Sequence, residues 1–554
     1  MRTGARFTLA LALLAPSVAI GQSTAPRLLA PAPSSTLTTA RPALRAQLGP
    51  GGQLTVCRDR AMRRACTLLQ GERPVLARDL AAGVWYWQGL TAAGGRTAVW
   101  PFVVARGRTP TASRVPSVDF DGDGFADLAA AATRNRLHGA SGEVEIFRGS
   151  SRGLSVRPGR ALRGVSPDDH YGSYLAAADV NGDGVTDLVV GAPEATVDAR
   201  RGSGLAHVFL GGRRGILASP ALRLTGDAEF EGLGLVARTG DVNGDGYEDV
   251  AIGGLHGSSA VPALHGQVGI HLGGPQGLAA TAATVLVGDS HAHMFGLEVA
   301  AGDFDGDGFA DLAAGDPFAS RGGERNGSVS VFRGGASGVE PSPAWVLVGQ
   351  SDGDGFGGSL AAGDVNGDGF ADLLIGAPTR SMRGSAAGAV YVHFGSVRGL
   401  STRAAEVLEG GQSSDTFGWR VACADLDGDG RDDAVITAPG ATGAAPAPGT
   451  PVHAAFALVY RAGATGALGG DAPVRLEGTI AGDLFGKSVA ALDVNGDGRP
   501  EVLVGSALAA GSGDDPFGFV QVYTSVAGAA LGATSVARLR GAVSGDLLGT
   551  TLAH

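Results

Sequence analysis

A nine-residue pattern of acidic residues and glycines occurs seven times in this sequence. In the copy that begins at Asp364, side-chain oxygens stand at positions 1, 3, 5 and 9 (Asp364, Asn366, Asp368 and Asp372), and glycines stand at positions 4 and 6. Ca²⁺ takes about six to eight oxygen ligands at about 2.3–2.6 Å, and a loop bent by glycine can bring alternate oxygens together. Position 7 would add its backbone carbonyl. The pattern therefore predicts a calcium-binding loop.

The seven copies begin 60, 62, 62, 61, 61 and 68 residues apart, so the loop belongs to a repeated unit such as a solenoid repeat or propeller blade. Position 3 is Asp in three copies and Asn in four, and position 9 is Asp except in the last copy, where it is Glu. We predict up to seven Ca²⁺ ions. The predicted ligands are Asp119, Asp121, Asp123, Phe125 and Asp127; Asp179, Asn181, Asp183, Val185 and Asp187; Asp241, Asn243, Asp245, Tyr247 and Asp249; Asp303, Asp305, Asp307, Phe309 and Asp311; Asp364, Asn366, Asp368, Phe370 and Asp372; Asp425, Asp427, Asp429, Arg431 and Asp433; and Asp493, Asn495, Asp497, Arg499 and Glu501.

Two other calcium-binding arrangements do not fit. An EF-hand needs flanking helices and a Glu at position 12, where this sequence has apolar residues such as Val190, Ile252 and Ile375. A β-roll repeats its motif about every nine residues, whereas dozens of residues separate these copies.

The composition favours an all-β fold with a large core. The chain has 554 residues, of which 93 are Gly and 44% are hydrophobic, which indicates many short strands and tight turns. The net charge is −11, but the ligand positions of the seven loops hold 24 carboxylates. The acidic balance therefore reflects the predicted metal sites rather than an acidic surface.

Residues 1–21 have the pattern of a secretory signal: Arg2 and Arg6, an apolar stretch of about 14 residues, and a small-residue cleavage site. The alternative, a membrane anchor, would need about 20 apolar residues, and no later segment is long enough to span a bilayer. We expect a secreted, extracellular or cell-envelope protein with no transmembrane span. Export favours a disulfide between Cys57 and Cys66, and we expect Cys423 to be a small buried core residue.

Residues 22–38 are rich in Pro, Ser, Thr and Ala and are predicted to form a linker. Residues 39–108 lack the calcium motif and are predicted to form a small β domain. Its five expected strands are 43–48, 53–57, 67–69, 84–89 and 97–105. The strand count and Val84-Trp85-Tyr86-Trp87 resemble a fibronectin type III or immunoglobulin-like sandwich. The alternative for this region is a plain β spacer.

Residues 355–409 show one complete repeat. Strand A (355–361) leads into the calcium loop, strand B (372–378) leaves it, and strands C (388–395) and D (405–409) follow a polar loop. Four short antiparallel strands form the blade of a β-propeller.

Three motifs recur in a fixed order across 113–554: a Phe-Gly pair, the acidic loop and Gly-Ala-Pro. Examples are Phe356-Gly357 and Gly376-Ala377-Pro378. This order resembles the FG-GAP repeat of the integrin α-subunit head. The resemblance implies an all-β, seven-bladed β-propeller, with its calcium loops on the face away from the ligand. The first repeat lacks Phe-Gly, and the chain ends on an extra strand A at 546–554, so we expect that strand to close the ring. Departures such as Gly505-Ser506-Ala507 put single turns in doubt.

The sequence shows no convincing catalytic constellation. We therefore expect no enzyme, no catalytic residue and no cofactor other than Ca²⁺, but a secreted, calcium-stabilised binding or adhesion protein. Its partner would be an extracellular protein or a glycan, not a nucleic acid. The basic residues in loops of the opposite face are either solvated loop charge or a contact for an anionic partner; they are Arg134, Arg136, His138, Arg200, Arg201, Arg321, Arg325, Arg380 and Arg383. The alternatives are a propeller-based extracellular enzyme (a polysaccharide lyase or phospholipase-like hydrolase) and a structural surface protein. Polar residues that converge at the centre of the disc would favour chemistry, and a broad rim would favour binding.

Overall fold

The computed structural model describes two parts of the chain. In the amino-terminal part it describes the strand residues 27–30, 35–37, 45–47, 53–57, 67–70, 83–90 and 100–104. It then describes 118–553 except for 134–140, 165, 167–168, 256–265, 289–293, 322, 382–385, 441–454, 464–467, 479–483, 508–517, 525–530 and 541–546. Every regular element in these residues is a β-strand. Within them no helix has the length and apolarity that a membrane crossing requires. The predicted signal, residues 1–21, lies outside the described residues.

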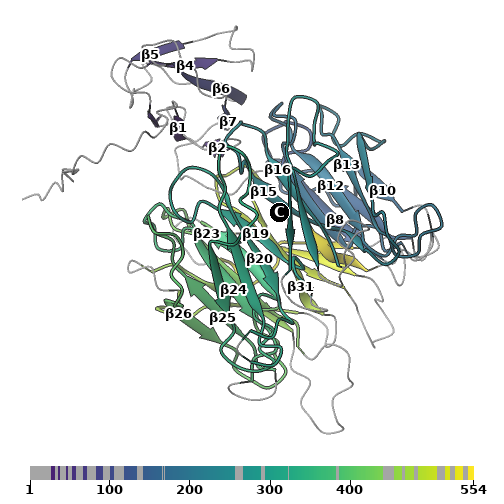
Figure 1. Ribbon diagram of the computed structural model, residues 1–554, viewed down its shortest axis with the longest axis vertical. Helices are drawn as coiled ribbons and strands as arrows, with labels where there is room; N and C mark the ends of the chain where they lie inside the picture. The colour runs from purple at the N-terminus through teal and green to yellow at the C-terminus, as the bar shows by residue number, and fades with distance from the viewer. Residues whose placement is uncertain are drawn as a thin grey trace, which may run out of the picture.

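Seven four-stranded antiparallel sheets between 128 and 552 form the blades of a β-propeller, arranged around a common axis (Figure 1). The innermost strands, in blade order, are β35 (Leu548–Leu552), β11 (Tyr174–Ala178), β15 (Leu233–Gly240), β19 (Val299–Gly302), β23 (Ser359–Gly363), β27 (Val421–Ala424) and β31 (Phe485–Leu492). The second strands are β8 (Leu128–Ala132), β12 (Asp187–Ala192), β16 (Asp249–Gly254), β20 (Asp311–Asp316), β24 (Asp372–Ala377), β28 (Asp433–Ala438) and β32 (Glu501–Ser506). The third strands are β9 (Glu143–Phe147), β13 (Leu205–Phe209), β17 (Gln267–His271), β21 (Ser328–Phe332), β25 (Ala389–His393), β29 (Phe456–Tyr460) and β33 (Phe519–Tyr523). The outer strands are β10 (Arg160–Arg163), β14 (Leu222–Thr225), β18 (Thr284–Val287), β22 (Trp345–Val348), β26 (Glu406–Glu409), β30 (Val474–Glu477) and β34 (Ala537–Arg540). The predicted all-β, seven-bladed fold is confirmed.

The last strand of the chain completes the first blade. β35 pairs antiparallel with β8, with Leu548 opposite Ala132 and Leu552 opposite Ala130. Its Leu548 and Leu552 side chains are buried. The strand expected at 546–554 therefore lies beside a segment that starts more than 400 residues earlier, and the ring has no open sheet edge at this position.

The second strand of each blade is buried along its whole length, for example Asp372–Ala377. Such strands read as continuous apolar runs because neighbouring blades cover both of their faces. The Phe-Gly motif shapes these seams. Phe356 is buried and meets the Tyr391 ring edge-on at 5.1 Å. A Cβ on Gly357 would lie 2.8 Å from the Ser328 carbonyl oxygen of the preceding blade. The glycine thus allows two blades to touch backbone to backbone.

The amino-terminal strands form two further sheets. β2 (Ser35–Leu37), β7 (Trp100–Val104), β6 (Gly83–Leu90), β4 (Gln53–Cys57) and β5 (Thr67–Gln70) form a five-stranded sheet in that order. β1 (Arg27–Ala30) pairs with β3 (Arg45–Gln47). The segment expected as a linker, 22–38, therefore supplies two strands, because β2 finds a parallel partner in β7. The sandwich arrangement stays a prediction, and the side chains of Cys57 and Cys66 lie outside the described residues.

Candidate metal centre

The first residue of each acidic loop is surrounded by backbone N–H groups. Asp364 Oδ1 accepts hydrogen bonds from the N–H groups of Gly367 (2.7 Å) and Asp368 (3.0 Å), and its Oδ2 accepts one from Gly369 (2.9 Å). The bond from the position 6 N–H to Oδ2 of position 1 recurs in all seven loops at 2.7–2.9 Å. Because the glycines adopt positive φ, the loop folds around this carboxylate.

The ninth residue ties the loop to the end of the third strand. In the fifth blade, Asp372 Oδ2 accepts the N–H of Val365 (3.0 Å) and Oδ1 accepts that of Gly395 (2.9 Å). The loops of the first six blades share both bonds. In the seventh loop Glu501 accepts the N–H of Val494 and the side-chain amide of Asn495. All seven acids are at most 2% exposed.

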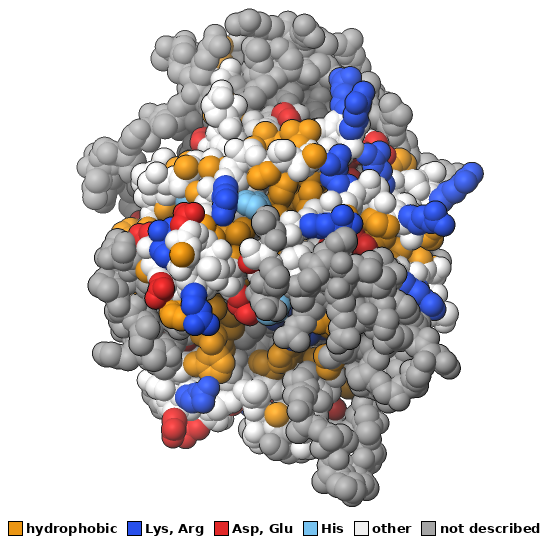
Figure 2. All heavy atoms as spheres, turned by 90° about the vertical axis from the view of Figure 1, so that its right-hand side faces the viewer, with side chains coloured by type: hydrophobic (Ala, Val, Ile, Leu, Met, Phe, Trp, Pro, Cys, Tyr) orange, Lys and Arg blue, Asp and Glu red, His pale blue; other side chains and the backbone are white. Residues whose placement is uncertain are grey.

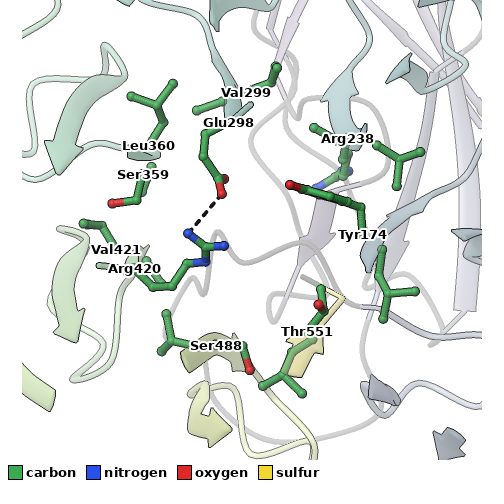
Figure 3. Close-up of a pocket in the computed structure, with 18 of the residues that line it drawn as sticks. Tyr174, Arg238, Glu298, Val299, Ser359, Leu360, Arg420, Val421, Ser488 and Thr551 are labelled. Carbon is green, nitrogen blue, oxygen red and sulfur yellow. Dashed lines mark ion pairs between the residues drawn. The ribbon is translucent and has the colours of Figure 1, made fainter. Parts of the chain in front are cut away.

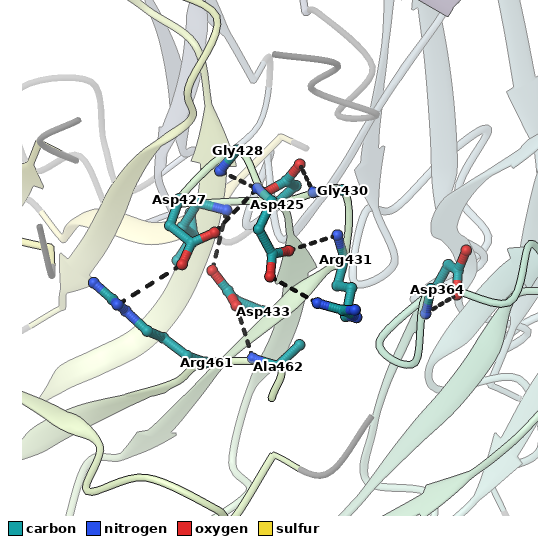
Figure 4. Close-up of polar contacts among 12 residues, drawn as sticks. Asp364, Asp425, Asp427, Gly428, Gly430, Arg431, Asp433, Arg461 and Ala462 are labelled. Atoms are coloured by element: carbon teal, nitrogen blue, oxygen red, sulfur yellow. Dashed lines mark hydrogen bonds and ion pairs between the residues drawn. The ribbon is translucent and has the colours of Figure 1, made fainter. Parts of the chain in front are cut away.

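Three loops gather carboxylates closely enough to hold one metal ion. Ligand atoms lie within 4.8 Å of one another in three groups: Asp119, Asp121 and Asp127; Asp303, Asp305 and Asp311; and Asp425, Asp427 and Asp429. Figure 4 shows the third of these loops, that of the sixth blade, with Asp425, Asp427 and Asp433 in it. In the other four loops position 3 is an Asn, whose Oδ1 accepts the position 5 N–H at 2.8–3.0 Å. In the three loops with Asp at position 3, the structure therefore brings the oxygens of positions 1, 3 and 5 or 9 together.

The donor set suits a hard divalent cation. The ligand positions supply oxygen atoms, and Asp121 Oδ1 is buried without a hydrogen-bond partner in the described structure. Burial, with a smaller contribution from neighbouring loop carboxylates, raises the pKa of Asp127 to about 8 and that of Asp187 to about 9. A buried anion is costly without a compensating charge. A divalent cation among these oxygens would remove that cost.

These raised pKa values predict an unusual pH dependence for the metal-free protein. Burial first, and nearby acids second, raise the pKa of Asp249 to about 8 and that of Glu501 to about 8, whereas the unfolded values are near 4. The folded state then binds more protons than the unfolded state between about pH 4 and 8, so stability falls as pH rises. With a chelator, we expect the melting temperature to rise as the pH is lowered from 8 to 5.

Saturating calcium should reverse this trend, because bound metal requires deprotonated ligands. Thermal melts at both conditions, recorded by circular dichroism from pH 5 to 8, provide the check. A chelated protein that loses stability as the pH falls through this range would show that the loop acids do not titrate as described.

Neighbouring loops contact one another around the ring. The N–H at position 8 donates to the position 1 carbonyl of the preceding loop at 2.8–3.4 Å in six of the seven junctions. At the remaining junction position 8 is Pro500, which has no N–H. The position 7 side chain lies over the position 4 glycine of the preceding loop, as Phe370 does over Gly306. The sequence alone predicted a role only for the carbonyl of position 7, because this side-chain contact joins different repeats.

The packing of position 7 predicts a steric limit at position 4. Gly306 and Gly122 have nearly equal φ, +72° and +70°, so alanine strains both backbones alike. A Cβ on Gly306 would lie 2.4 Å from Phe370 Cε1, whereas one on Gly122 would lie 3.2 Å from Val185 Cγ2. We expect Gly306→Ala to destabilise the protein by about 1–3 kcal/mol more than Gly122→Ala.

Chemical denaturation of both variants measures this difference. The Phe370→Ala background should remove most of the excess cost of Gly306→Ala. Equal costs of Gly306→Ala with and without Phe370 would contradict the steric explanation.

A second candidate site lies on the propeller axis. A cavity of about 290 Å³ is lined by all seven innermost strands and the residues that lead into them. The residue two positions after the motif glycine lines it in every blade: Tyr174, Val236, Glu298, Ser359, Arg420, Ser488 and Thr551. Figure 3 shows these side chains converging from different strands. This fixed offset from Phe-Gly is the sequence signal that could have identified the cavity residues.

The charges at the cavity are paired. Arg420 Nη1 lies 3.0 Å from Glu298 Oε1 (Figure 3), and Arg238 makes two contacts to Glu248, one of them from Nε at 3.1 Å. Burial raises the pKa of Tyr174 to about 12, with Glu298 adding to the effect. Cys423, expected to be a small buried core residue, is half-buried: it packs against an apolar core cluster and also lines this cavity.

Two of the arginines expected in the basic loops of the opposite face are buried or lie in ion pairs. Arg380 is only 5% exposed, lies over the Tyr391 ring at 5.0 Å and approaches Glu409 at 3.8 Å. Arg200 pairs with Asp198 at 3.5 Å. Arg134, Arg136, His138 and Arg383 lie outside the described residues. On the side shown in Figure 2, basic side chains are scattered among acidic and apolar ones and form no single patch.

Models of a known repeat family match the repeated units of this sequence. The FG-GAP repeat model matches residues 295–332, 356–393, 417–450 and 485–523, and an FG-GAP-like repeat model matches 119–190. Integrin alpha-PS3 of Drosophila melanogaster is 36% identical over 215 residues, which are 37% of this chain and 18% of that protein. Phosphatidylinositol-glycan-specific phospholipase D of Bos taurus is 31% identical over 256 residues, which are 42% of this chain and 30% of that protein.

The chain thus spans less than a third of the length of these curated relatives. The crystal structure of rhamnogalacturonan lyase YesW aligns with 87% of this chain and 88% of its own at a TM-score of 0.31 and 11% identity, a likeness too low to carry an argument. The residues that match the repeat models lie in the blades of the propeller, in the same order along the chain. The chain contains FG-GAP repeats and is similar in sequence to integrin α-subunits.

Proposed function

We propose that this protein is a secreted, calcium-stabilised binding or adhesion protein that presents propeller loops to an extracellular protein or glycan. The observation that carries the proposal is the ring of seven acidic loops, each with a carboxylate at position 9 that is at most 2% exposed. The loops occupy one face of the disc, since the position 9 acids also bind the turns after the third strands. The opposite face, with the longer and more varied loops, remains for a partner.

Calcium is the cation that the donor set favours. Each loop offers only oxygen donors on a flexible, glycine-bent backbone, which suits Ca²⁺ better than the strict octahedron that Mg²⁺ requires. When bound, the ion would supply positive charge to buried carboxylates, and its binding energy would add to folding stability. The proposed ligands are those predicted from the sequence, with position 9 serving both the metal and the third strand.

The cavity on the axis favours a structural role over catalysis. A general base works best with a pKa near the working pH, whereas burial holds the pKa of Tyr174 at about 12. Arg420 and Arg238 are held by Glu298 and Glu248. Nothing among these described lining residues forms a nucleophile activated by a base.

One observation supports a propeller-based enzyme as a second candidate function. Lys487 lies beside the cavity residue Ser488 and sits over the Trp419 ring at 4.2 Å. Burial, together with the charge of Arg420, lowers its pKa to about 8, which is suitable for a general base. The Arg420 guanidinium could then bind an acidic substrate group in place of Glu298. A lyase or hydrolase of this kind would lose its activity in Lys487→Met.

A binding screen separates the two functions. The full chain, labelled and loaded with calcium, is applied to a glycan array and to immobilised extracellular matrix proteins, with chelated protein as the control. We expect calcium-dependent retention on a defined glycan or protein and no turnover of the retained ligand. Turnover that Lys487→Met abolishes would favour the enzyme, and absence of retention on both surfaces would contradict the binding role.

A further inference from the structure

The type of residue that follows the third strand of a blade depends on which residue stands at position 3 of the acidic loop in the same blade. Where position 3 is Asp, this residue is Arg, and where position 3 is Asn, it is uncharged. The Asp–Arg pairs are Asp121 with Arg148, Asp305 with Arg333, and Asp427 with Arg461. The Asn loops have Asn181 with Leu210, Asn243 with Leu272, Asn366 with Phe394, and Asn495 with Thr524. The match holds in all seven blades.

The structure shows why the two positions go together. Arg148 Nη1 lies 3.0 Å from Asp121 Oδ2, Arg333 Nε lies 3.2 Å from Asp305 Oδ2, and Arg461 Nη1 lies 3.8 Å from Asp427 Oδ2. In each pair the arginine approaches the same oxygen. Figure 4 shows Arg461 reaching Asp427 from beyond the loop while Asp433 lies inside it. The end of the third strand therefore places a cation next to position 3.

In two of the three Asp loops, the other oxygen of position 3 accepts the same hydrogen bond as the Oδ1 atom of the asparagines. Asp305 Oδ1 accepts the N–H of Asp307 at 3.2 Å, as Asn366 Oδ1 accepts that of Asp368 at 2.8 Å. In the first loop Asp121 Oδ1 is buried without a hydrogen-bond partner in the described structure. Both kinds of loop thus present one oxygen inward, and they differ only in the second atom, Oδ2 or Nδ2.

The Nδ2 group of the asparagines replaces the arginine. Asn243 Nδ2 donates to Asp245 Oδ2 at 3.2 Å, and Asn366 Nδ2 lies 3.4 Å from Asp372 Oδ1. An amide needs no counter-ion, whereas a carboxylate added to a loop with three others does. Four carboxylates with one arginine carry the same charge, −3, as three carboxylates alone. When only the ligand carboxylates and the residue after the third strand are counted, the seven loops are therefore alike in charge.

We propose that Arg148, Arg333 and Arg461 are positioning residues that act as built-in counter-ions of the position 3 aspartate, so that an Asp–Arg pair is equivalent to an Asn at a metal loop. The arginine takes Oδ2, leaves Oδ1 to the metal and keeps the loop folded before metal binds. The part of this inference that concerns calcium binding rests on the proposed function. The charge compensation in the metal-free loop is independent of the proposed function.

The exposed fractions of the arginine and aspartate side chains determine whether loss of either residue strengthens or weakens folding and metal binding. The arginine side chains are 35–46% exposed, but Asp121 and Asp305 are only 5% and 9% exposed. Loss of the arginine leaves a buried carboxylate without compensation. The metal-free loop then becomes less stable, while the extra negative charge attracts a cation more strongly. Loss of the carboxylate alone leaves a cation beside the metal loop and weakens metal binding.

A double-mutant cycle in the full-length protein tests the pair. Arg148→Leu, Asp121→Asn and the double variant are melted in a chelator and in a calcium series. We expect Arg148→Leu to melt a few degrees lower than the parent in chelator and to reach half of its calcium stabilisation at a roughly tenfold lower concentration of the ion. The double variant, which reproduces an Asn loop, should have the parent's melting temperature in chelator and the parent's calcium concentration at half stabilisation. Arg148→Lys, which keeps the charge, should stay close to the parent.

The converse change in the fifth blade provides a matched control. Asn366→Asp adds a carboxylate with no arginine at hand, so we expect a lower melting temperature in chelator, and Phe394→Arg in the same chain should recover it. If the effects of the single substitutions simply add in both blades, the inference is overturned. If calcium leaves every melting curve unchanged but the chelator cycles are non-additive, the proposed calcium role fails and the charge compensation stands.

Discussion

A chelator is expected to lower the melting temperature of this protein by roughly 10 °C or more. A site that is saturated about 100-fold above its dissociation constant contributes about 2.7 kcal/mol, and seven loops are available. In the metal-free form, buried acids such as Asp127 and Asp187 lack a compensating cation. Because the loops contact one another at six junctions, the loss should spread around the ring as one cooperative effect.

Differential scanning calorimetry before and after chelation, with calcium restored in excess, measures this loss. Magnesium at the same concentration is the matched control and should restore less of the melting temperature, since it requires near-ideal octahedral geometry. A melting curve that chelation leaves in place would contradict a structural role for metal in the loops.

Deletion of residues 547–554 is expected to abolish cooperative folding of the propeller. β35 supplies the innermost strand of the first blade and contacts both neighbouring blades. The Ser488 hydroxyl of the seventh blade donates to the Gly549 carbonyl at 2.7 Å, and the Thr551 hydroxyl donates to the Ser173 carbonyl of the second blade at 2.9 Å. Its removal would uncover the edge of β8 and the apolar residues beneath Leu548. An open sheet edge of this kind favours aggregation.

Calorimetry of the truncated chain shows whether it still unfolds cooperatively, and size-exclusion chromatography shows whether it aggregates. Leu548→Ala is the graded control, and we expect it to cost about 2–5 kcal/mol while the ring stays closed. A truncated protein that remains monomeric and melts with the parent would show that β35 does not close the ring.

The sequence predicted what is repeated within one blade. The acidic loops, the four strands of each unit and the all-β propeller follow from spacing and from the Phe-Gly and Gly-Ala-Pro motifs. Even the closing strand was predictable, since the first repeat lacks a strand that the end of the chain supplies. These features depend on residues near one another in the chain, so periodicity identifies them.

Contacts between blades were not predictable in the same way. The packing of Phe370 over Gly306 joins loops of different repeats, and the burial of Arg380 depends on Tyr391 and Glu409 beneath it. The cavity on the axis assembles one residue from each blade, and their types differ so widely that only their common offset from the motif glycine connects them. The arginines that follow three of the third strands carry a sequence signal as well, but it has meaning only once the structure places them beside position 3.

The number of calcium ions bound to the purified protein is the most direct measure of whether the seven loops hold metal. After dialysis against calcium and removal of free ions, inductively coupled plasma mass spectrometry combined with amino-acid analysis gives the number of ions per chain. We predict about seven calcium ions per chain, falling by about one when Asp372→Ala removes the position 9 carboxylate of a single loop. A protein that retains no calcium while its propeller stays folded would contradict it.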